Sequence, residues 1–482
     1  MKFKLVSFFV FIFVNFFLTG KNAAEVRITV KIPEWKNEKV LFCSHFNGLI
    51  YRQDSLYLSA SGEGTFQKEE NYDEGIYLLV LNPDKYTDLL LAEDQALSVV
   101  INDTTDLIES MQISGANQSE AFLSFTRLIK EKKSLQEEIV NRYQALSEEE
   151  KEKTGEQTQK QMNDLNREVE KTQADLIDRY KGRWFGFLLQ SQLPVTTGPY
   201  PAPKTQEEYD EEFKYQKEHF FDHINLQDLR FWRTDFFPGK IIRYMEKQVE
   251  QYPDSLAAAA SRLVAKTTGD SLSFQLMMNK LIDFSAQSLI MGMENIWAKL
   301  VEDYYHKGLV TWGDSAHWAN IEFEYNKLRY NRIGMYAHDM ALQDSTGRRF
   351  KLYDLAKKYT LLYLYEPSCG HCIETTPKIY EQIYKKYAGK GMDVVAVCIN
   401  NDKKEWTDFT ERHHLEGEHW HNLWDPERES YFWKFYDTSS TPSIYILDEN
   451  KKIVAKKIDV NSIDLIFNSF FERENQNTSA GQ

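Results

Sequence analysis

The stretch YEPSCGHCIETTPKIY, from Tyr365 to Tyr380, holds two of the four cysteines of this 482-residue chain, Cys369 and Cys372. It continues from YTLLYLY (359–365), a nearly continuous apolar run of the kind that forms a strand buried on both faces. We expect a helix to begin at Cys369 or shortly after it. The cysteine pair would then lie where a buried strand ends and a helix N-terminus presents unpaired N–H groups and a partial positive charge.

This position favours redox chemistry. A thiolate at a helix N-terminus is stabilised, and its pKa falls from roughly 8.5 towards roughly 3.5–7.5. Cys369 is therefore the candidate nucleophile, and Cys372, one turn further on, is placed to resolve a mixed disulfide. Gly370 is expected to allow the tight turn, and a protonated His371 would favour the thiolate and make the disulfide more oxidising. Pro377 predicts a kink in the helix beyond the cysteines.

A late proline adds to this interpretation. Thr441–Pro442 precedes SIYILD, which is predicted to be a strand. A cis proline there would pack against the disulfide and leave the Thr441 backbone free to bind a substrate chain. Only about 5–6% of X–Pro bonds in folded proteins are cis, so the trans form remains the alternative on sequence alone.

Metal binding is the competing interpretation of the pair. Zinc sites usually take a second Cys-x-x-Cys, whereas Cys43 and Cys398 are single cysteines in apolar, strand-like runs that suggest buried, inert thiols. Two alternatives stay open: copper carriage by the pair itself, and a Cys2His2 site. The histidines available for the second are His413, His414, His419 and His421.

The rest of the C-terminal stretch alternates strands and helices. MDVVAVCIN reads as a second buried strand, EWTDFTERHHL and SYFWKFYD as helices, SIYILDENKKIVAKKI as a hairpin turning at Asp448–Asn450, and SIDLIFNSFFERE as a closing helix. This order predicts an α/β sheet with a right-handed crossover.

The upstream chain has a different organisation. Short β-branched and aromatic runs separated by turn residues predict a small β sandwich or open barrel from residue 25 to about 115. From Asn117 to about Tyr330 the apolar spacing is helical, interrupted by the proline-rich LPVTTGPYPAPK (193–204). The formal charge of −15 argues against nucleic acid as a partner.

The first residues are typical of a secretory signal. Lys2 and Lys4 precede the apolar run Leu5–Leu18, and small or polar residues follow up to Ala24. The run is shorter than the ~20 residues of a membrane-spanning helix. We expect cleavage near Ala24 and a mature, exported form that does not span a membrane; an uncleaved N-terminal anchor is the alternative.

The strand, the Cys-Gly-His-Cys motif, the helix proline and the late Thr-Pro resemble the thioredoxin fold. The segment IGMYAHDMALQDSTGRRFKLYDLAKKYTLLYLYEPSCGHC (Ile333–Cys372) resembles exported thiol–disulfide oxidoreductases of the TlpA/ResA type. The whole chain is similar to Bacteroidetes envelope proteins that join a DUF4369-type β domain and a DUF5106-type helical domain to such a module. We therefore expect a multidomain α+β protein divided as follows: 1–24 signal peptide, 25–116 β domain, 117–330 helical domain, 331–475 thioredoxin-like α/β domain, 476–482 disordered tail.

The resemblance also implies roles for individual residues. Cys369 would be the nucleophile, Cys372 the resolving thiol and Pro442 the cis proline, with the Cys369–Cys372 disulfide as the redox-active group and no other cofactor. The chain departs from the family at Tyr363, where thioredoxin has a buried acid, and at Thr375, where ResA-type proteins place a glutamate. The nearby carboxylates are Glu366 and Glu374. Glu366 also occupies the threonine position of the peroxiredoxin Thr-x-x-Cys pattern, which disfavours peroxidase activity.

The resulting hypothesis is an oxidoreductase of the periplasm or cell envelope, similar to the proteins of cytochrome c biogenesis. It would exchange disulfides with protein thiols and be served by an upstream membrane or periplasmic reductant or oxidant. The alternative is a cell-envelope binding or scaffold protein whose redox module is regulatory or vestigial.

Overall fold

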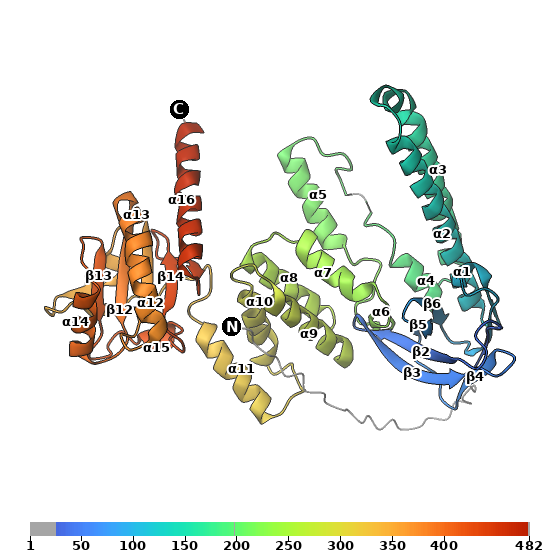
Figure 1. Ribbon diagram of the computed structural model, residues 1–482, viewed down its shortest axis with the longest axis horizontal. Helices are drawn as coiled ribbons and strands as arrows, with labels where there is room; N and C mark the ends of the chain where they lie inside the picture. The colour runs from blue at the N-terminus through green and yellow to red at the C-terminus, as the bar shows by residue number, and fades with distance from the viewer. Residues whose placement is uncertain (1–25, 197, 481–482) are drawn as a thin grey trace. The chain divides into compact units, whose positions relative to one another are not determined.

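A computed structural model describes residues 26–196 and 198–480 (Figure 1). It divides the chain into two compact units, Met1–Lys240 and Ile241–Gln482. The predicted signal peptide, residues 1–24, lies outside the described residues. Within the described part of the chain, no helix is both long and apolar enough to cross a membrane.

The first unit begins with two four-stranded sheets. The strands are β1 (Val26–Lys31), β2 (Lys39–Phe46), β3 (Leu49–Tyr57), β4 (Glu63–Lys68), β5 (Gly75–Asn82), β6 (Lys85–Leu91), β7 (Ala96–Ile101) and β8 (Met111–Ser114). One sheet has the order β4-β1-β7-β8 and the other β3-β2-β5-β6. Alternate residues of β1, such as Val26, Ile28 and Val30, are buried because side chains point to opposite faces along a strand. They share one core with Phe42 of the other sheet, so the predicted β sandwich is confirmed.

Helices follow the sheets within this unit. They are α1 (Leu107–Ser110), α2 (Asn117–Gln144), α3 (Glu148–Arg179), α4 (Trp184–Gln190), α5 (Gln206–His219) and α6 (Leu229–Trp232). The long helices α2 and α3 form an antiparallel pair (Figure 1), and a capping box between Ser147 and Glu150 starts the second of them. The first turn of α2 packs on β6, where the Ser119 hydroxyl donates to the Leu90 carbonyl oxygen at 2.7 Å.

The second unit contains more helices and then a large sheet. Its helical part comprises α7 (Phe237–Lys247, which crosses the unit boundary), α8 (Pro253–Ala265), α9 (Ser271–Gln287), α10 (Glu294–Leu300), the π-helical turn η1 (Val301–Tyr305) and α11 (Ser315–Leu328). Met277 and Met278 of α9 are fully buried and fill the core of this helical part.

The remaining elements form the predicted thioredoxin-like α/β sheet. They are β9 (Ala341–Gln343), β10 (Arg349–Lys351), η2 (Leu352–Asp354), β11 (Tyr359–Tyr365), α12 (Gly370–Lys378), η3 (Ile379–Tyr384), α13 (Lys385–Tyr387), η4 (Ala388–Lys390), β12 (Met392–Cys398), α14 (Lys403–Arg412), β13 (Trp420–Trp424), α15 (Phe432–Phe435), β14 (Ser443–Leu447), β15 (Ile453–Lys456) and α16 (Val460–Ala480). The sheet order is β10-β9-β13-β12-β11-β14-β15. β11 pairs parallel with β12 and antiparallel with β14, so it lies inside the sheet, next to the middle strand β12.

Strand β11 is buried on both faces, as its apolar run predicts. Tyr363 and Tyr365 face a core that includes Cys372 of α12 and residues of α14 and α16. Leu362 and Leu364 face the opposite core, with residues of β9 and α15. The sheet is therefore the middle of three layers, and α12 starts at the carboxyl end of β11.

Two details of the helices differ from or extend the expectations. Pro377 lies inside α12, and the backbone continues as the π-helical segment η3, because proline supplies no N–H to the helical ladder. At the C-terminus, α16 continues to Ala480, so the segment 476–482 predicted as a disordered tail is helical as far as that residue.

A buried lysine joins the sheet to the helical part of the second unit. Lys456 of β15 is 4% exposed, and its Nζ lies 2.9 Å from Glu294 Oε1 of α10. It also donates to Asn331 Oδ1 at 3.1 Å. Burial lowers the Lys456 pKa, and the Glu294 carboxylate partly offsets this effect. These contacts place residues 241–330 and the sheet in one compact unit, although the sequence suggested a domain boundary at 330/331.

Candidate active site

The two cysteines occupy the start of α12 but differ in exposure. Cys369 is the N-cap residue; its N–H donates to the Glu366 carbonyl oxygen at 3.1 Å, and its own carbonyl accepts from Ile373 at 3.0 Å. Its side chain is partly exposed, whereas Cys372 is fully buried. The chain therefore turns out of β11 and presents one sulfur at the surface with the other beneath it.

The environment shifts the pKa values of the two thiols in opposite directions. A side-chain hydrogen bond from Thr441 is the largest influence that lowers the Cys369 pKa, and the backbone N–H groups of His371 and Cys372 add to it against a smaller opposing effect of burial. Burial raises the pKa of Cys372 to about 11. Cys369 is thus the thiol that ionises first, and the two side chains share a hydrogen bond.

Thr441 reaches this site from the turn just before the neighbouring strand, β14. The Cys369 thiol donates to the Thr441 carbonyl oxygen at 3.4 Å. The Thr441 side chain also bonds to Cys372 and lowers its pKa against the larger effect of burial. The peptide bond between Thr441 and Pro442 is cis. Antiparallel pairing of β14 with β11 is what brings residue 441 to a sulfur 72 residues earlier in the chain.

A second hydrogen-bonded pair lies on the buried side of Cys372. The Tyr363 hydroxyl is 2.6 Å from Thr376 Oγ1, and Thr376 donates to the Cys372 carbonyl oxygen at 2.8 Å. Tyr363 also bonds to the Cys372 side chain, and burial raises the Tyr363 pKa so far that the phenol stays neutral. Thr376 was not among the site residues predicted from the sequence; its spacing of four residues from Cys372 on a helix was the available signal.

The other predicted site residues lie around the pair with less direct contact. His371 and Glu374 are exposed on α12, while Glu366 is partly exposed and bonds to Cys372 through its backbone N–H. Thr375 is partly exposed. Gly370 differs from the expectation: a Cβ would meet nothing within 4 Å and its φ lies outside the left-handed region, so the turn does not require glycine.

The remaining cysteines are buried, and two of the histidines considered as metal ligands lie beside a carboxylate. Cys43 and Cys398 are buried, and burial raises the pKa of Cys398 to about 12. His419 Nδ1 lies 3.1 Å and His421 Nε2 3.6 Å from Asp393 Oδ1. In the described ranges, no group of three or more His, Cys, Asp or Glu side chains is placed to hold a metal ion.

Comparison with known proteins agrees with this geometry. The sequence model of the Redoxin family matches residues 332–468. The curated protein "Thiol-disulfide oxidoreductase ResA" of Bacillus subtilis (strain 168) is 26% identical over 121 residues, which are 25% of this chain and 64% of that protein. The chain thus spans less than two thirds of the length of this curated relative.

Two solved structures illustrate the similarity found for this chain. A domain of a possible thiol-disulfide isomerase from Cytophaga hutchinsonii ATCC 33406 is 33% identical, covers 30% of this chain and 96% of that one, and has a TM-score of 0.28. A thioredoxin-like protein from Bacteroides caccae ATCC 43185 is 16% identical, covers 57% and 97%, and has a TM-score of 0.40.

The fold and the paired thiols place the C-terminal part of the chain in the class of thioredoxin-like oxidoreductases. Within that class the matching family is Redoxin, and residues 332–468 are the part of the chain that it describes. Residues before 332 lie outside the match.

Proposed function

We propose that the protein is an exported thiol–disulfide oxidoreductase that acts on protein substrates through Cys369 and Cys372. The observation that carries this proposal is the inequality of the two thiols: Cys369 is partly exposed with a lowered pKa, and Cys372 is buried with a pKa of about 11. The ionised, accessible Cys369 sulfur attacks the substrate disulfide, and the buried Cys372 sulfur reacts in the second step.

The exchange is balanced in atoms and electrons. The Cys369 thiolate attacks one sulfur of a substrate disulfide, so a mixed disulfide forms and the other substrate sulfur leaves as a thiolate that takes up a proton from water. Cys372 then gives its proton to water and attacks Cys369 Sγ, and the first substrate sulfur leaves as a thiolate that takes up a proton from water. The substrate gains two electrons, and the protein is left with the Cys369–Cys372 disulfide; the reverse sequence oxidises a dithiol substrate.

Thr441 and backbone N–H groups support the attack by the Cys369 thiolate. The Thr441 hydroxyl stabilises the attacking thiolate, and the N–H groups at the start of α12 do the same. The carbonyl of Thr441, the residue before Pro442, lies beside the same sulfur, and we propose that an extended substrate chain binds there.

Trapping the mixed disulfide tests this function. The full-length Cys372→Ala variant should accumulate covalent adducts with disulfide-containing protein substrates, which dithiothreitol releases, and it should not reduce insulin catalytically. The Cys369→Ala/Cys372→Ala variant is the negative control, and Cys398→Ala, which changes another buried thiol, should behave as the wild type. Absence of adducts from a folded Cys372→Ala protein together with inactive wild type would contradict the proposal.

The setting of the reaction is also part of the proposal. We propose that residues 1–24 are a signal peptide, that the mature protein works in the periplasm or cell envelope, and that an upstream redox protein there returns the pair to its starting state. The β domain (25–116) would be of the DUF4369 type and the helical domain (117–330) of the DUF5106 type. No cofactor beyond the disulfide is required.

A cell-envelope binding or scaffold role is a second candidate function. It is favoured by the first unit, which has its own sheet core and lies outside the Redoxin match. Equilibration of the protein with glutathione buffers separates the two: a pair that stays in one redox state across the whole range favours the scaffold, and a measurable midpoint favours the oxidoreductase.

A further inference from the structure

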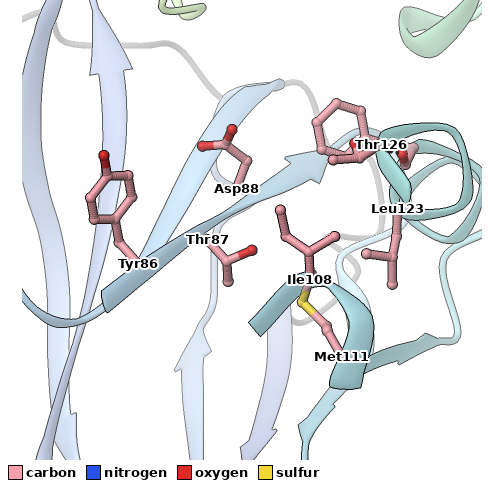
Figure 2. Close-up of a pocket in the computed structure, with 8 residues that line it drawn as sticks. Tyr86, Thr87, Asp88, Ile108, Met111, Leu123 and Thr126 are labelled. Carbon is pink, nitrogen blue, oxygen red and sulfur yellow. Dashed lines mark hydrogen bonds between the residues drawn. The ribbon is translucent and has the colours of Figure 1, made fainter. Parts of the chain in front are cut away.

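The first unit contains an elongated trough between β6, α2 and α4, far along the chain from the cysteine pair. Its wider part has a volume of about 400 Å³ and its narrower part about 150 Å³. Both parts are lined by Asp88, Phe122 and Thr126, so they are continuous. Figure 2 shows the narrower part, with Tyr86, Thr87 and Asp88 of β6 on one side and Leu123 and Thr126 of α2 on the other.

The walls of the wider part are mainly apolar and aromatic. The apolar residues that line it are Ile76, Phe122, Phe125, Ile129, Phe185, Leu188, Leu189 and Phe236. The rings of Phe122 and Phe185 meet edge to face, with centroids 6.1 Å apart. A pocket of this volume with apolar walls and a few polar groups is typical of a ligand site.

The polar groups of the trough are anionic or neutral. Asp88 and Asp235 supply two carboxylates, and Thr126 and Gln192 supply neutral polar groups, whereas no Lys or Arg is among the described residues that line either part. Asp88 and Asp235 are exposed to solvent beside the apolar walls, where their carboxylates give a negative potential that attracts a cation. The aromatic faces favour the same charge.

A histidine that does not line the trough, His45, lies beside Asp88. His45 Nε2 lies 3.9 Å from Asp88 Oδ1, and the Asp88 side chain remains 46% exposed. Asp88 is therefore accessible to a ligand approaching from solvent.

The shape of the site indicates a peptide. The trough runs beside the first half of β6, which is the edge strand of its sheet; no described strand pairs with its outer side, and α2 packs on the later part of the strand, where Ser119 donates to the Leu90 carbonyl. An edge strand offers backbone hydrogen-bonding groups to an extended chain, and the neighbouring hollows accept its side chains. The two connected parts of the trough suit successive side chains of such a chain.

We propose that this trough binds an extended segment of a partner protein in which a Lys or Arg stands beside large apolar side chains. The basic group would pair with Asp88 and Asp235, and the apolar side chains would pack against Phe122 and its neighbours. The site goes beyond disulfide exchange: it would recognise a partner whether or not that partner carries a reactive disulfide.

Binding of matched cysteine-free peptides to the full chain tests the proposal. The probes are three fluorescein-labelled amides: Ser-Leu-Phe-Lys-Leu-Ser, the same peptide with norleucine in place of lysine, and the same peptide with glutamate there. In fluorescence polarisation, we expect the lysine peptide to bind at least tenfold more tightly than the norleucine peptide and the glutamate peptide to bind most weakly.

Variants connect that preference to the trough. Asp88→Asn/Asp235→Asn should bring the lysine peptide to the affinity of the norleucine peptide, and Phe125→Ala should weaken binding of both. Asp94→Asn, an equal change of charge at an exposed residue that does not line the trough, should leave all affinities unchanged. Equal affinities for the three peptides, no saturable binding, or full retention of the preference in the double variant would overturn the proposal. Binding by Cys369→Ala protein keeps this test separate from the redox function.

Discussion

The hydroxyl oxygens of Tyr363 and Thr376 lie 2.6 Å apart on the buried side of Cys372. Because Thr376 donates its proton to the Cys372 carbonyl oxygen, the hydrogen between the two hydroxyls comes from Tyr363. Tyr363 is neutral and also bonds to the Cys372 side chain. When Cys372 ionises, the one phenolic hydrogen can turn from Thr376 to the Cys372 sulfur, so the neutral phenol can stabilise the thiolate. It cannot take the proton from Cys372 as a buried carboxylate would.

Replacement of Tyr363 by Phe should therefore slow the second step of the exchange. The Cys372 thiolate would lose a donor, and a net hydrogen bond of about 1 kcal/mol corresponds to a several-fold slower release of the mixed disulfide. Stopped-flow measurement of release at several pH values checks this, since the slowing should shrink as the pH approaches the Cys372 pKa. Tyr365→Phe, which removes a hydroxyl from the ring stacked on Tyr363, is the control. Equal rates for Tyr363→Phe and wild type would contradict the assigned role.

The two thiols should titrate in separate ranges. The Cys369 pKa is below the ordinary value of 9.0, whereas that of Cys372 is raised to about 11. Alkylation of the native reduced protein by iodoacetamide, followed by peptide mass spectrometry, should modify Cys369 first, with a half-point below pH 9.0. Faster labelling of Cys372 than of Cys369 in the folded protein would refute this assignment.

Stability of the reduced protein should depend on pH with opposite signs for these two thiols. The lowered pKa of Cys369 stabilises the fold above pH 9.0, and this contribution is lost as pH falls through the folded-state pKa. The raised pKa of Cys372 makes a contribution that is complete below pH 9.0 and lost as pH rises towards about 11. Urea unfolding of wild type and Cys372→Ala between pH 8 and 11 measures the second: wild type should lose more stability over this range.

Thr441→Val should reduce the reactivity of Cys369. The variant removes the hydrogen bond that contributes most to the lowered pKa, so a smaller fraction of the thiol is ionised near neutral pH. Hydrogen bonds to charged groups are worth about 1.5–3 kcal/mol when buried; for this partly exposed sulfur we expect a decrease of up to about tenfold in the alkylation rate at pH 7. The reduction potential should become more negative, because the reduced form loses stabilisation. Ser440→Ala, an exposed neighbour, should change neither quantity.

Replacing Glu294 and replacing Lys456 in their buried pair should destabilise the second unit by different amounts. Glu294→Gln leaves a 3% exposed lysine side chain without its counter-charge, and loss of one partner of a buried pair costs about 3–5 kcal/mol. Lys456→Met should cost less, because Glu294 is 27% exposed and can be hydrated. Denaturant unfolding of both variants and of the double variant gives the coupling; additive losses would show that the pair contributes nothing.

The sequence predicted the parts of the fold that depend on local pattern. The apolar run 359–365 became the buried strand β11, and the helix after it begins at Gly370, directly after Cys369, as expected. The β sandwich followed from short β-branched runs between turns. These features are encoded in neighbouring residues, so a single sequence suffices to find them.

Features that depend on distant contacts could not be found in this way. Lys456 lies in a lysine-rich hairpin that suggests an exposed strand, yet the packing of α10 buries it against Glu294. Similarly, only the pairing of β14 with β11 brings Thr441 to both sulfurs. The contribution of Thr376 required knowing that α12 turns this side chain towards Tyr363.

The unequal burial of the two sulfurs limits how the domain can meet other proteins. Because Cys372 has no surface exposed to solvent, an electron donor and an electron acceptor must dock over the same atom, Cys369 Sγ, and so they must come one after the other. Turnover would then follow a ping-pong mechanism, with parallel double-reciprocal plots at different donor concentrations. Excess of either partner would inhibit, because it would occupy the docking site over Cys369 Sγ that the other partner needs.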